Sequence, residues 1–191
     1  MRIVSGFLKG KRIDFLKSAS TRPLRDFVKE SMFNVIKHSS LINISLEHSC
    51  VLDFYSGVGS FGIECISRGA KMATFIENNS NTLEVLKKNI NYLKITQKVN
   101  ISETKVISFL NKLKKKNKYE IIFFDPPFSE SYFIEELKIL KNSNIFSKEH
   151  VVVIHRESKS EEDLSEVINI ITTKKYGRSK IIFGSFKLKA S

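Results

Sequence analysis

The sequence predicts an α/β protein built on a mostly parallel, doubly wound sheet, with an antiparallel hairpin at its carboxyl-terminal edge. Three observations predict this class. From residue 49 onward, short apolar runs alternate with longer segments of helical period, which is typical of βαβ units. Residues 166–189 instead contain two strand-like runs with Gly177 between them. A chain of 191 residues, 41% of them hydrophobic, can bury one core of good size, so one main domain is expected.

The elements of this domain follow from local patterns. Runs rich in Val, Ile and Phe predict the strands, and apolar residues three and four positions apart, such as Leu83, Leu86 and Ile90, predict the helices. Gly69 is placed to end the first helix. The predicted strands are 50–54, 72–77, 98–102, 119–125, 150–157, 166–177 and 179–189, and the predicted helices are 61–69, 81–95, 106–116 and 131–140.

Residues 1–48 do not follow this alternation. Residues 1–15 predict a small hairpin that turns at Lys9 to Lys11. Residues 24–38 predict an amphipathic helix, because Val28, Met32, Phe33 and Ile36 fall on one side. We therefore expect an amino-terminal extension of one hairpin and one helix over residues 1–48, followed by the main domain over residues 49–191.

The charge of the chain favours a polyanionic partner. Its 32 Lys and Arg residues against 20 Asp and Glu residues give a net charge of +12, which makes nucleic acid the leading candidate. Residues 111–118 are lysine-rich and predict an exposed helix end and loop. The basic residues ahead of the main domain are the candidates for phosphate contacts: Lys9, Lys11, Arg12, Arg22 and Arg25.

Other classes of protein receive little support. No apolar stretch approaches the length of a membrane span, and the amino terminus lacks a signal-peptide pattern, so we expect a cytoplasmic protein. Cys50 and Cys65 have no metal-ligand spacing, and the four histidines are scattered and interpreted as ordinary. We expect no metal site, and a monomer.

A glycine-rich loop follows the first predicted strand. In VLDFYSGVGSFG, residues 51–62, the glycines at 57, 59 and 62 have the spacing GxGxxG where a strand turns into a helix. Such a loop lets the backbone approach a ligand closely, and the helix start offers free N–H groups. The residues expected to bind a cofactor here are Tyr55, Ser56, Gly57 and Gly59. A tight strand-to-helix turn without a ligand is the alternative for the spacing alone.

Two acids define the ligand further. Asp53 at the tip of the first strand would repel a pyrophosphate but accommodate an ammonium group. Glu77 ends the second strand, twenty residues after Gly57, where an acid binds ribose hydroxyls, and Asn78 is beside it. A nucleoside with an amino-acid tail fits this pattern, which indicates S-adenosylmethionine. NAD is the second candidate.

The sequence FFDPPF, residues 123–128, indicates the reaction. Asp125 follows the fourth strand, at the same sheet edge as Asp53 and Glu77, where open α/β sheets bind ligands. Pro126 and Pro127 lack N–H groups and stiffen a turn that presents carbonyl oxygens. Asp125 and the Pro126 carbonyl can accept the two N–H bonds of an exocyclic amine during methyl transfer, and Phe128 can stack on the base. Asp125, Pro126, Pro127 and Phe128 are thus the predicted catalytic residues.

These residues carry a family resemblance. The segments VLDFYSGVGSFGIE, FIENN and FFDPPF resemble the Rossmann-like class I S-adenosylmethionine-dependent methyltransferases that act on amino groups. RIVSGFLKGKRI and TRPLRDFVKESMFNVI are similar to the amino-terminal signature of the bacterial 16S ribosomal RNA guanine-N2 methyltransferase family. The match runs from Arg2 to about Phe128, and the remaining third is compatible in length and pattern.

The resemblance implies methyl transfer from S-adenosylmethionine to N2 of a guanine in 16S rRNA of the small subunit, with the extension assisting RNA binding. It assigns Asp53, Gly57 and Gly59 to the cofactor loop and Glu77 to the ribose, and it places the adenine ring near residues 104–105. Two alternatives stay open at this point: a DNA adenine amino-methyltransferase, and a non-catalytic RNA-binding module. The short chain leaves little room for the target-recognition region of the first, and intact acids argue against the second.

Overall fold

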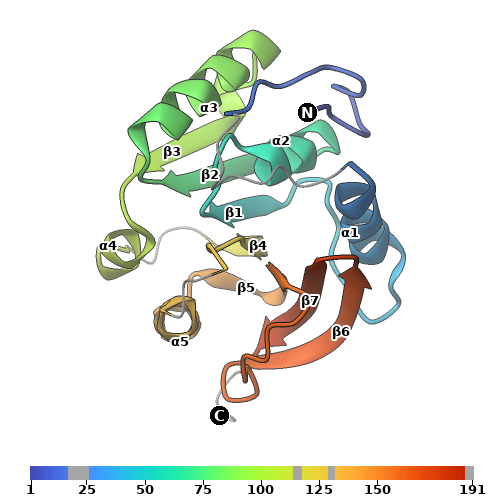
Figure 1. Ribbon diagram of the computed structural model, residues 1–191, viewed down its shortest axis with the longest axis vertical. Helices are drawn as coiled ribbons and strands as arrows, with labels where there is room; N and C mark the ends of the chain where they lie inside the picture. Colours follow the sequence, from blue (N-terminus) through green and yellow to red (C-terminus); the bar gives the residue numbers. More distant parts are fainter. Residues whose placement is uncertain (17–25, 114–117, 129–131, 188–191) are drawn as a thin grey trace.

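The computed structural model describes residues 1–16, 26–113, 118–128 and 132–187. These residues form one seven-stranded sheet with the strand order β3-β2-β1-β4-β5-β7-β6 and with helices on both faces (Figure 1). The predicted class, a mostly parallel sheet with an antiparallel carboxyl-terminal edge, is confirmed.

The parallel half of the sheet positions the site. Its strands are β1 (Cys50–Phe54), β2 (Met72–Glu77), β3 (Val99–Glu103) and β4 (Tyr119–Phe124). β1 lies between β2 and β4, and Asp53 is in register with Phe75 of β2 and Phe123 of β4. The predicted bounds of β1 and β2 are confirmed, because both strands are buried on both faces and so contain continuous apolar runs.

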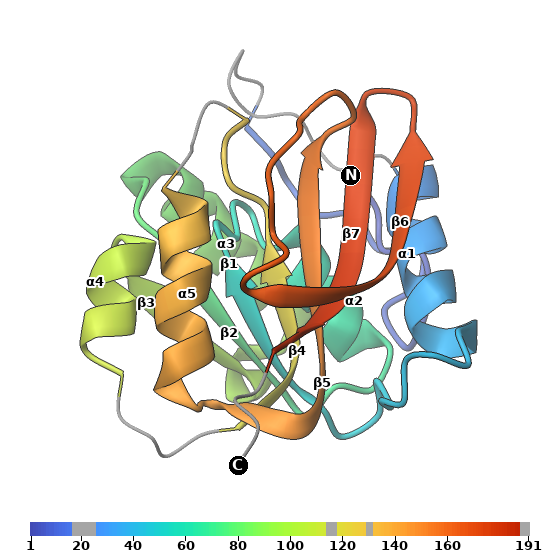
Figure 2. The ribbon, with the colours of Figure 1, turned by 90° about the horizontal axis from the view of Figure 1, so that it is seen from below.

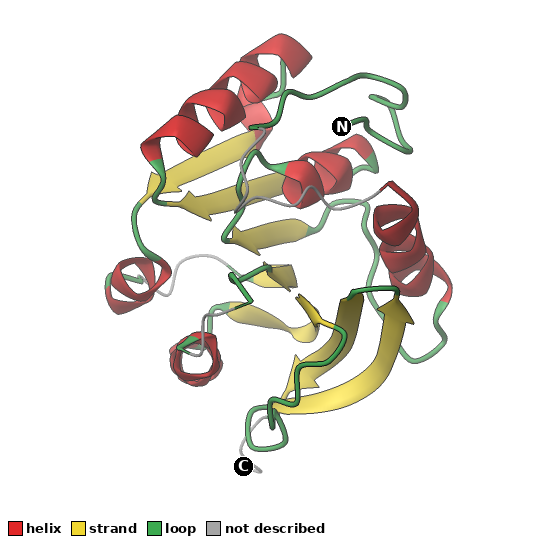
Figure 3. Ribbon diagram, in the orientation of Figure 1, coloured by secondary structure: helices red, strands yellow, loops and turns green. Residues whose placement is uncertain are grey.

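Helices cover the two faces of the sheet unequally (Figure 3). One face is packed by α1 (Asp26–His38), α2 (Ser60–Ser67) and α3 (Ser80–Leu93), and the other by α4 (Val106–Asn111) and α5 (Phe133–Ser143). A short 3₁₀ helix, Thr96–Lys98, leads into β3. On the first face, the ring of Phe61 stacks on Phe123 with centroids 4.1 Å apart. On the second, Phe54 stacks on Phe124 at 4.5 Å.

The carboxyl-terminal edge contains β5 (Phe146–Glu157), β6 (Ile168–Tyr176) and β7 (Ser179–Phe186). β7 inserts between β5 and β6 and is antiparallel to both, as Figure 2 shows. The turn between β6 and β7 contains Gly177 with φ +59°, a left-handed conformation that glycine adopts without strain. The predicted hairpin near Gly177 is confirmed.

Several predicted bounds differ from the structure. β5 begins at Phe146 rather than at residue 150, because Phe146 pairs with Tyr119 of β4. α5 spans Phe133–Ser143 rather than 131–140, and α4 ends at Asn111 rather than at 116. Leu113, just past the end of α4, still packs against the hydrophobic core beside this helix. Residues 114–117 lie outside the described residues.

The amino-terminal hairpin is smaller than predicted, and its turn begins earlier. Its arms pair through one antiparallel bridge between Arg2 and Arg12, and the turn spans residues 7–10, so it overlaps the predicted turn only at Lys9 and Gly10. Gly6 has φ +82°, and a Cβ there would lie 1.7 Å from the backbone oxygen of Ser67 in α2. This close approach to α2 fixes the turn.

The helix predicted in the extension is confirmed as α1. Its predicted apolar face is buried, and Met32 and Phe33 are fully buried. Burial of a side chain of this size contributes about 1.5–3 kcal/mol. Ile3, Leu8 and Ile13 join the same hydrophobic cluster as α1, α2 and α3. The division into residues 1–48 and 49–191 stays a prediction.

Within the described ranges, no helix is both long enough and apolar enough to cross a membrane.

Candidate active site

The glycine loop between β1 and α2 is held in a left-handed conformation. Tyr55 and Gly57 have φ +55°, and Gly59 has φ +87° directly before α2 begins. The N–H of Ser56 donates to the carbonyl of Ile76 at 3.1 Å, which ties the loop to the end of β2. The third glycine serves packing, because a Cβ on Gly62 would lie 2.4 Å from the Phe75 ring.

Asp53 is buried beneath this loop. Its Oδ2 accepts the N–H of Gly62 at 2.9 Å, whereas Oδ1 is buried and has no hydrogen-bond partner. Burial raises the pKa of Asp53 well above its ordinary value; the Gly62 N–H opposes this, and the charges of Asp125 and Glu77 add to it. Asp53 is not among the residues lining the neighbouring cavity. Its contact with a cofactor ammonium stays a prediction, while its contact with Gly62 braces the first turn of α2.

Glu77 connects the loop to the start of α3. Its Oε2 accepts the N–H of Gly57 at 2.8 Å, and Oε1 accepts the N–H groups of Asn78 and Asn79 at 2.9 and 2.8 Å. Asn79 caps α3 by accepting the N–H of Thr82. The Glu77 carboxyl group is therefore oriented by three backbone donors and retains lone pairs for a ligand.

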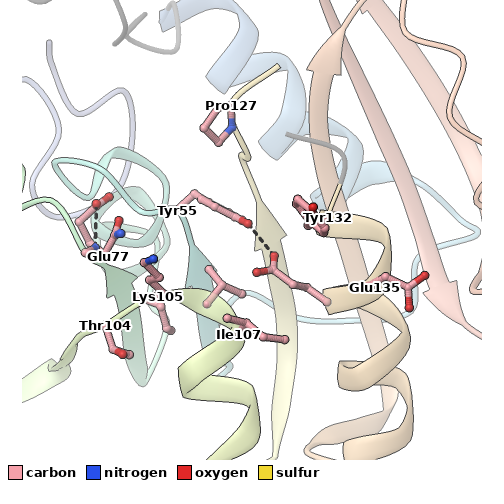
Figure 4. Close-up of a pocket in the computed structure, with 12 residues that line it drawn as sticks. Tyr55, Glu77, Thr104, Lys105, Ile107, Pro127, Tyr132 and Glu135 are labelled. Atoms are coloured by element: carbon pink, nitrogen blue, oxygen red, sulfur yellow. Dashed lines mark hydrogen bonds between the residues drawn. The ribbon is translucent and has the colours of Figure 1, made fainter. Parts of the chain in front are cut away.

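A cavity of about 480 Å³ opens at this edge of the sheet. Figure 4 shows Glu77, Thr104 and Lys105 on one side and, on the other, Glu135 of α5 and Tyr132 directly before this helix, with Tyr55 between the two sides. The lining residues are Tyr55, Ile76, Glu77, Asn78, Thr104, Lys105, Val106, Ile107, Pro127, Tyr132, Glu135 and Glu136. The predicted residues Ser56, Gly57 and Gly59 belong to the loop but not to this lining.

The cavity lining contains the predicted residues Tyr55, Glu77 and Asn78 and adds others, such as Glu136, that the sequence did not predict. Tyr55 donates its hydroxyl to Glu136 Oε2 at 2.6 Å, so β1 and α5 are linked across the cavity floor. Ile76, Val106 and Ile107 give the cavity an apolar side next to Glu77. Sequence alone indicates Glu136 only weakly, because it is one acid in an amphipathic helix pattern. Its partner Tyr55 is 81 residues away, so no local pattern links the two.

The Asp-Pro-Pro-Phe turn lies beside this cavity. The N–H of Asp125 donates to the carbonyl of Phe54 at 3.4 Å, so the turn leaves β4 next to the glycine loop. The Asp125 side chain is 33% exposed, Pro126 is buried, and Pro127 forms part of the cavity lining. The Phe128 ring is 36% exposed, so a face of it remains accessible for stacking. Three predicted carboxylates, Asp53, Glu77 and Asp125, thus meet at one sheet edge.

Two further residues contact the turn and were missed. His155 lies 2.8 Å from the Asp125 carboxyl group, and Arg156 donates to the carbonyl of Pro127 at 3.0 Å. Arg156 also donates, at 3.4 Å, to the Pro126 carbonyl that was predicted to accept from substrate. The sequence does contain one indication of these two residues: a polar pair directly follows the apolar run VVVI. Polar residues that a buried strand carries need hydrogen-bond partners, so contacts of this pair could have been expected.

The predicted RNA-binding residues are only partly described. Lys9, Lys11 and Arg12 are exposed on the amino-terminal turn. Arg22 and Arg25 lie outside the described residues. Within the described part of the chain, no group of three or more His, Cys, Asp or Glu residues could hold a metal ion.

Comparisons with known proteins identify relatives of the whole chain. A family model described as "Conserved hypothetical protein 95" matches residues 1–185. Two relatives named "Ribosomal RNA small subunit methyltransferase D" come from strains of Buchnera aphidicola. One is 34% identical over 157 residues, 82% of this chain and 78% of the relative. The other is 30% identical over 186 residues, 97% of this chain and 91% of the relative.

The fold is shared with solved structures. A protein of Escherichia coli described as a proposed methyltransferase has a TM-score of 0.82 to this chain at 24% identity, with 98% of each chain covered. This likeness establishes the Rossmann-like class I methyltransferase fold.

Proposed function

The chain belongs to the methyltransferase family described as Conserved hypothetical protein 95, and we propose that it methylates N2 of a guanine in 16S rRNA of the small ribosomal subunit. The methyl donor in this proposal is S-adenosylmethionine. The main support for this proposal is that Glu77 and Pro127 of the Asp-Pro-Pro-Phe turn line the same cavity. A nucleoside site and an amine-binding turn thus adjoin.

The residues present fit S-adenosylmethionine. The cavity of about 480 Å³ is within the usual range for small-molecule sites. Glu77 would bind the ribose hydroxyls, and Ile76, Val106 and Ile107 would contact the adenine ring. The carboxyl groups of Glu77 and Asp125 favour a cationic ligand over the pyrophosphate of NAD. When bound, S-adenosylmethionine supplies an electrophilic methyl group on a sulfonium centre.

The residues of the turn act on the acceptor amine. Asp125 would accept an N–H bond of the guanine N2 group, which favours the pyramidal nitrogen and the positive charge that develops on it. The lone pair of N2 would form the bond to the methyl carbon as the carbon–sulfur bond breaks and leaves its electron pair on sulfur, and the proton then lost from nitrogen would go to Asp125 or to water. Phe128 would stack on a guanine that has left its base stack.

The amino-terminal extension would contribute the RNA contacts. Lys9, Lys11 and Arg12 are exposed and suited to phosphate binding, and Arg22 and Arg25 complete the proposed set. The turn that carries the first three is fixed to α2 by the N–H of Phe7, which donates to Ser67 at 2.8 Å. We further propose that the protein acts as a cytoplasmic monomer.

The proposed activity is tested by transfer of labelled methyl groups to small ribosomal subunits from cells that lack this protein. Nucleoside analysis of the product should give 2-methylguanosine. Labelled methyladenosine would instead identify an adenine amine as the acceptor. Absence of label despite measurable S-adenosylmethionine binding would favour a non-catalytic RNA-binding protein.

Glu77→Gln should weaken S-adenosylmethionine binding about 10- to 100-fold, since a hydrogen bond to a charged group contributes about 1.5–3 kcal/mol. The amide nitrogen of Gln would face a backbone N–H now bound by Glu77, so the loop and the ribose would both lose an acceptor. Isothermal titration calorimetry measures the effect. Glu84→Gln, an exposed position on α3, is the matched control and should bind normally. Equal affinities of the two variants for S-adenosylmethionine would contradict a role of Glu77 in cofactor binding.

A further inference from the structure

Two consecutive residues at the end of β5 contact the Asp125–Phe128 turn. His155 and Arg156 are only 7% and 3% exposed, and they follow the fully buried residues 151–154. β5 lies between β4 and β7 in the sheet. Because neighbouring side chains on a strand point to opposite faces, His155 and Arg156 reach the turn from the two sides of the sheet.

His155 binds the carboxyl group of Asp125. Its Nδ1 is 2.8 Å from Asp125 Oδ1, and its Nε2 is 2.9 Å from Ser179 Oγ of β7. A carboxylate oxygen only accepts hydrogen bonds, so this contact requires a proton on Nδ1, and Ser179 Oγ is the partner of Nε2. Asp125 Oδ2 has no hydrogen-bond partner among the described residues. One oxygen of the carboxylate is thus fixed by the imidazole, and the other remains for a ligand.

Arg156 binds the backbone of the same turn. Its Nη1 donates to the carbonyl oxygens of Pro126 and Pro127 at 3.4 and 3.0 Å, and its Nη2 donates to that of Phe128 at 3.0 Å. The turn lies beyond the end of β4, so a side chain supplies donors that a strand ladder does not. Three successive carbonyl groups are oriented by one planar guanidinium.

The guanidinium is itself held in place. Arg156 Nε donates to Glu162 Oε1 at 2.6 Å, and its Cζ lies 4.5 Å from the centre of the Phe133 ring. Burial opposes ionisation of Glu162, but the hydrogen bond from Arg156 lowers its pKa, so this carboxyl group is ionised at neutral pH. The ammonium of Lys180 lies 3.6 Å from the other Glu162 oxygen. Charge, a hydrogen bond and a ring face therefore set the orientation of Arg156.

Stability alone does not account for these contacts. Replacing a buried ion pair by apolar side chains is often neutral or stabilising, so the Arg156–Glu162 pair is a weak source of folding free energy. The contacts converge on the turn: one residue binds the side chain of Asp125, and the next binds the three carbonyls that follow it. A misplacement of about 1 Å in a reacting group can lower a rate about 100-fold.

On the basis of the methyl transfer proposed above, we propose that His155 and Arg156 are positioning residues of the transfer step. His155 fixes the Asp125 carboxylate so that Oδ2 faces the acceptor amine. Arg156 fixes the Pro126–Phe128 backbone so that its carbonyls and the Phe128 ring keep their orientation. Neither residue contacts the substrate.

The protonation of His155 tests the first half without any substrate. Nitrogen-15 NMR of the full-length protein at neutral pH should show His155 as the Nδ1–H tautomer. Asp125→Asn should perturb the His155 ring nitrogens, and His38→Asn, an exposed position on α1, should not. An Nε2–H tautomer would overturn the proposal, because Nδ1 would then have no proton to donate to Asp125.

Kinetics separates positioning from packing. In His155→Asn the amide can replace Nδ1–H toward Asp125, whereas in His155→Gln it reaches instead toward Ser179. We expect kcat to stay within about threefold of wild type for Asn and to fall about 10- to 100-fold for Gln, with the Kd of S-adenosylmethionine unchanged in both. Equal kcat values in the two variants would contradict the role of His155. If the wild-type protein does not methylate small subunits, the proposed function is wrong. The NMR measurement of the His155 tautomer then still tests the contact between His155 and Asp125.

Arg156→Lys tests the second half. Lys keeps the positive charge for Glu162, but one ammonium group cannot orient three carbonyls as a planar fork does. We expect kcat to fall about tenfold or more with an unchanged Kd of S-adenosylmethionine. Circular dichroism verifies the fold, and Glu162→Gln, which keeps an acceptor for Nε, provides a milder second variant with a smaller loss. Wild-type kcat in both variants would overturn the role of Arg156.

Discussion

Asp125→Asn should lower the rate of methyl transfer about 100- to 1,000-fold while cofactor affinity stays within about threefold of wild type, the range found when one preorganised group that stabilises developing charge is removed. Asn keeps the shape of the side chain but removes the negative charge next to the nitrogen that becomes positive. The NH₂ group of Asn would also face another hydrogen-bond donor, either His155 Nδ1–H or the substrate amine. The loss should therefore appear in the chemical step.

Single-turnover transfer to small ribosomal subunits measures this step, and calorimetric titration with S-adenosylmethionine measures binding. Asp163→Asn is the matched control, because Asp163 is exposed on the segment between β5 and β6, where it accepts the N–H of Ser165 in its own turn. It should behave as wild type. A rate for Asp125→Asn within tenfold of wild type would exclude Asp125 as the principal acceptor of the amine N–H bond.

Local sequence predicted the central parallel strands β1 and β2 because both are buried on both faces. CVLDF and MATFIE are mostly apolar runs ended by a glycine loop and a polar helix start, so their bounds match the structure. The start of the amino-terminal turn was misplaced because both Gly6 and Gly10 adopt a left-handed conformation, so local sequence does not show where the turn begins. The close approach of Gly6 to Ser67 fixes the start, and that contact spans 61 residues of sequence, a separation that no local pattern reports.

The difference between local patterns and contacts of distant residues also applies to the candidate site. Asp53, Glu77 and Asp125 could be assigned to one edge from the sequence, because parallel strands joined by helices bring their carboxyl ends together. His155 and Arg156 could not, since their role depends on β5 lying next to β4 and on β7 supplying Ser179. The Tyr55–Glu136 contact likewise requires α5 to pack beside the loop that follows β1, which only the packed structure shows.

A buried ion network fixes the amino-terminal extension to the methyltransferase core. Lys29 of α1 and Glu64 of α2 are fully buried, with Nζ and Oε2 3.4 Å apart. Glu64 also accepts the N–H groups of Val4 and Ser5 at 2.9 Å and Arg68 Nε at 2.9 Å. Burial lowers the pKa of Lys29, and the charge of Glu64 opposes this shift. One carboxylate thus serves two cations and two backbone donors.

Glu64→Gln should lower the free energy of unfolding by about 3–5 kcal/mol, the range found when one partner of a buried ion pair is removed. Gln is nearly isosteric, so the loss arises from charge: Lys29 would stay buried with its ammonium bonded to the carbonyl of Arg2 but without the adjacent carboxylate of Glu64. Urea denaturation measures the change. Glu30→Gln, on the exposed side of α1 next to Lys29 in sequence, should change stability by less than about 0.5 kcal/mol.

Hydrogen exchange locates the effect of Glu64→Gln. The amides of Val4 and Ser5 both donate to the Glu64 carboxylate, and a Gln side chain has only one oxygen to accept them. Their protection should fall first, while amides of the buried strand β1 should change only with global stability. Since this segment leads into the turn with Lys9, Lys11 and Arg12, its loosening should also weaken RNA binding without changing the affinity for S-adenosylmethionine. A loss of less than 1 kcal/mol with full protection at Val4 and Ser5 would show that packing of Ile3, Leu8 and Ile13 alone holds the extension in place.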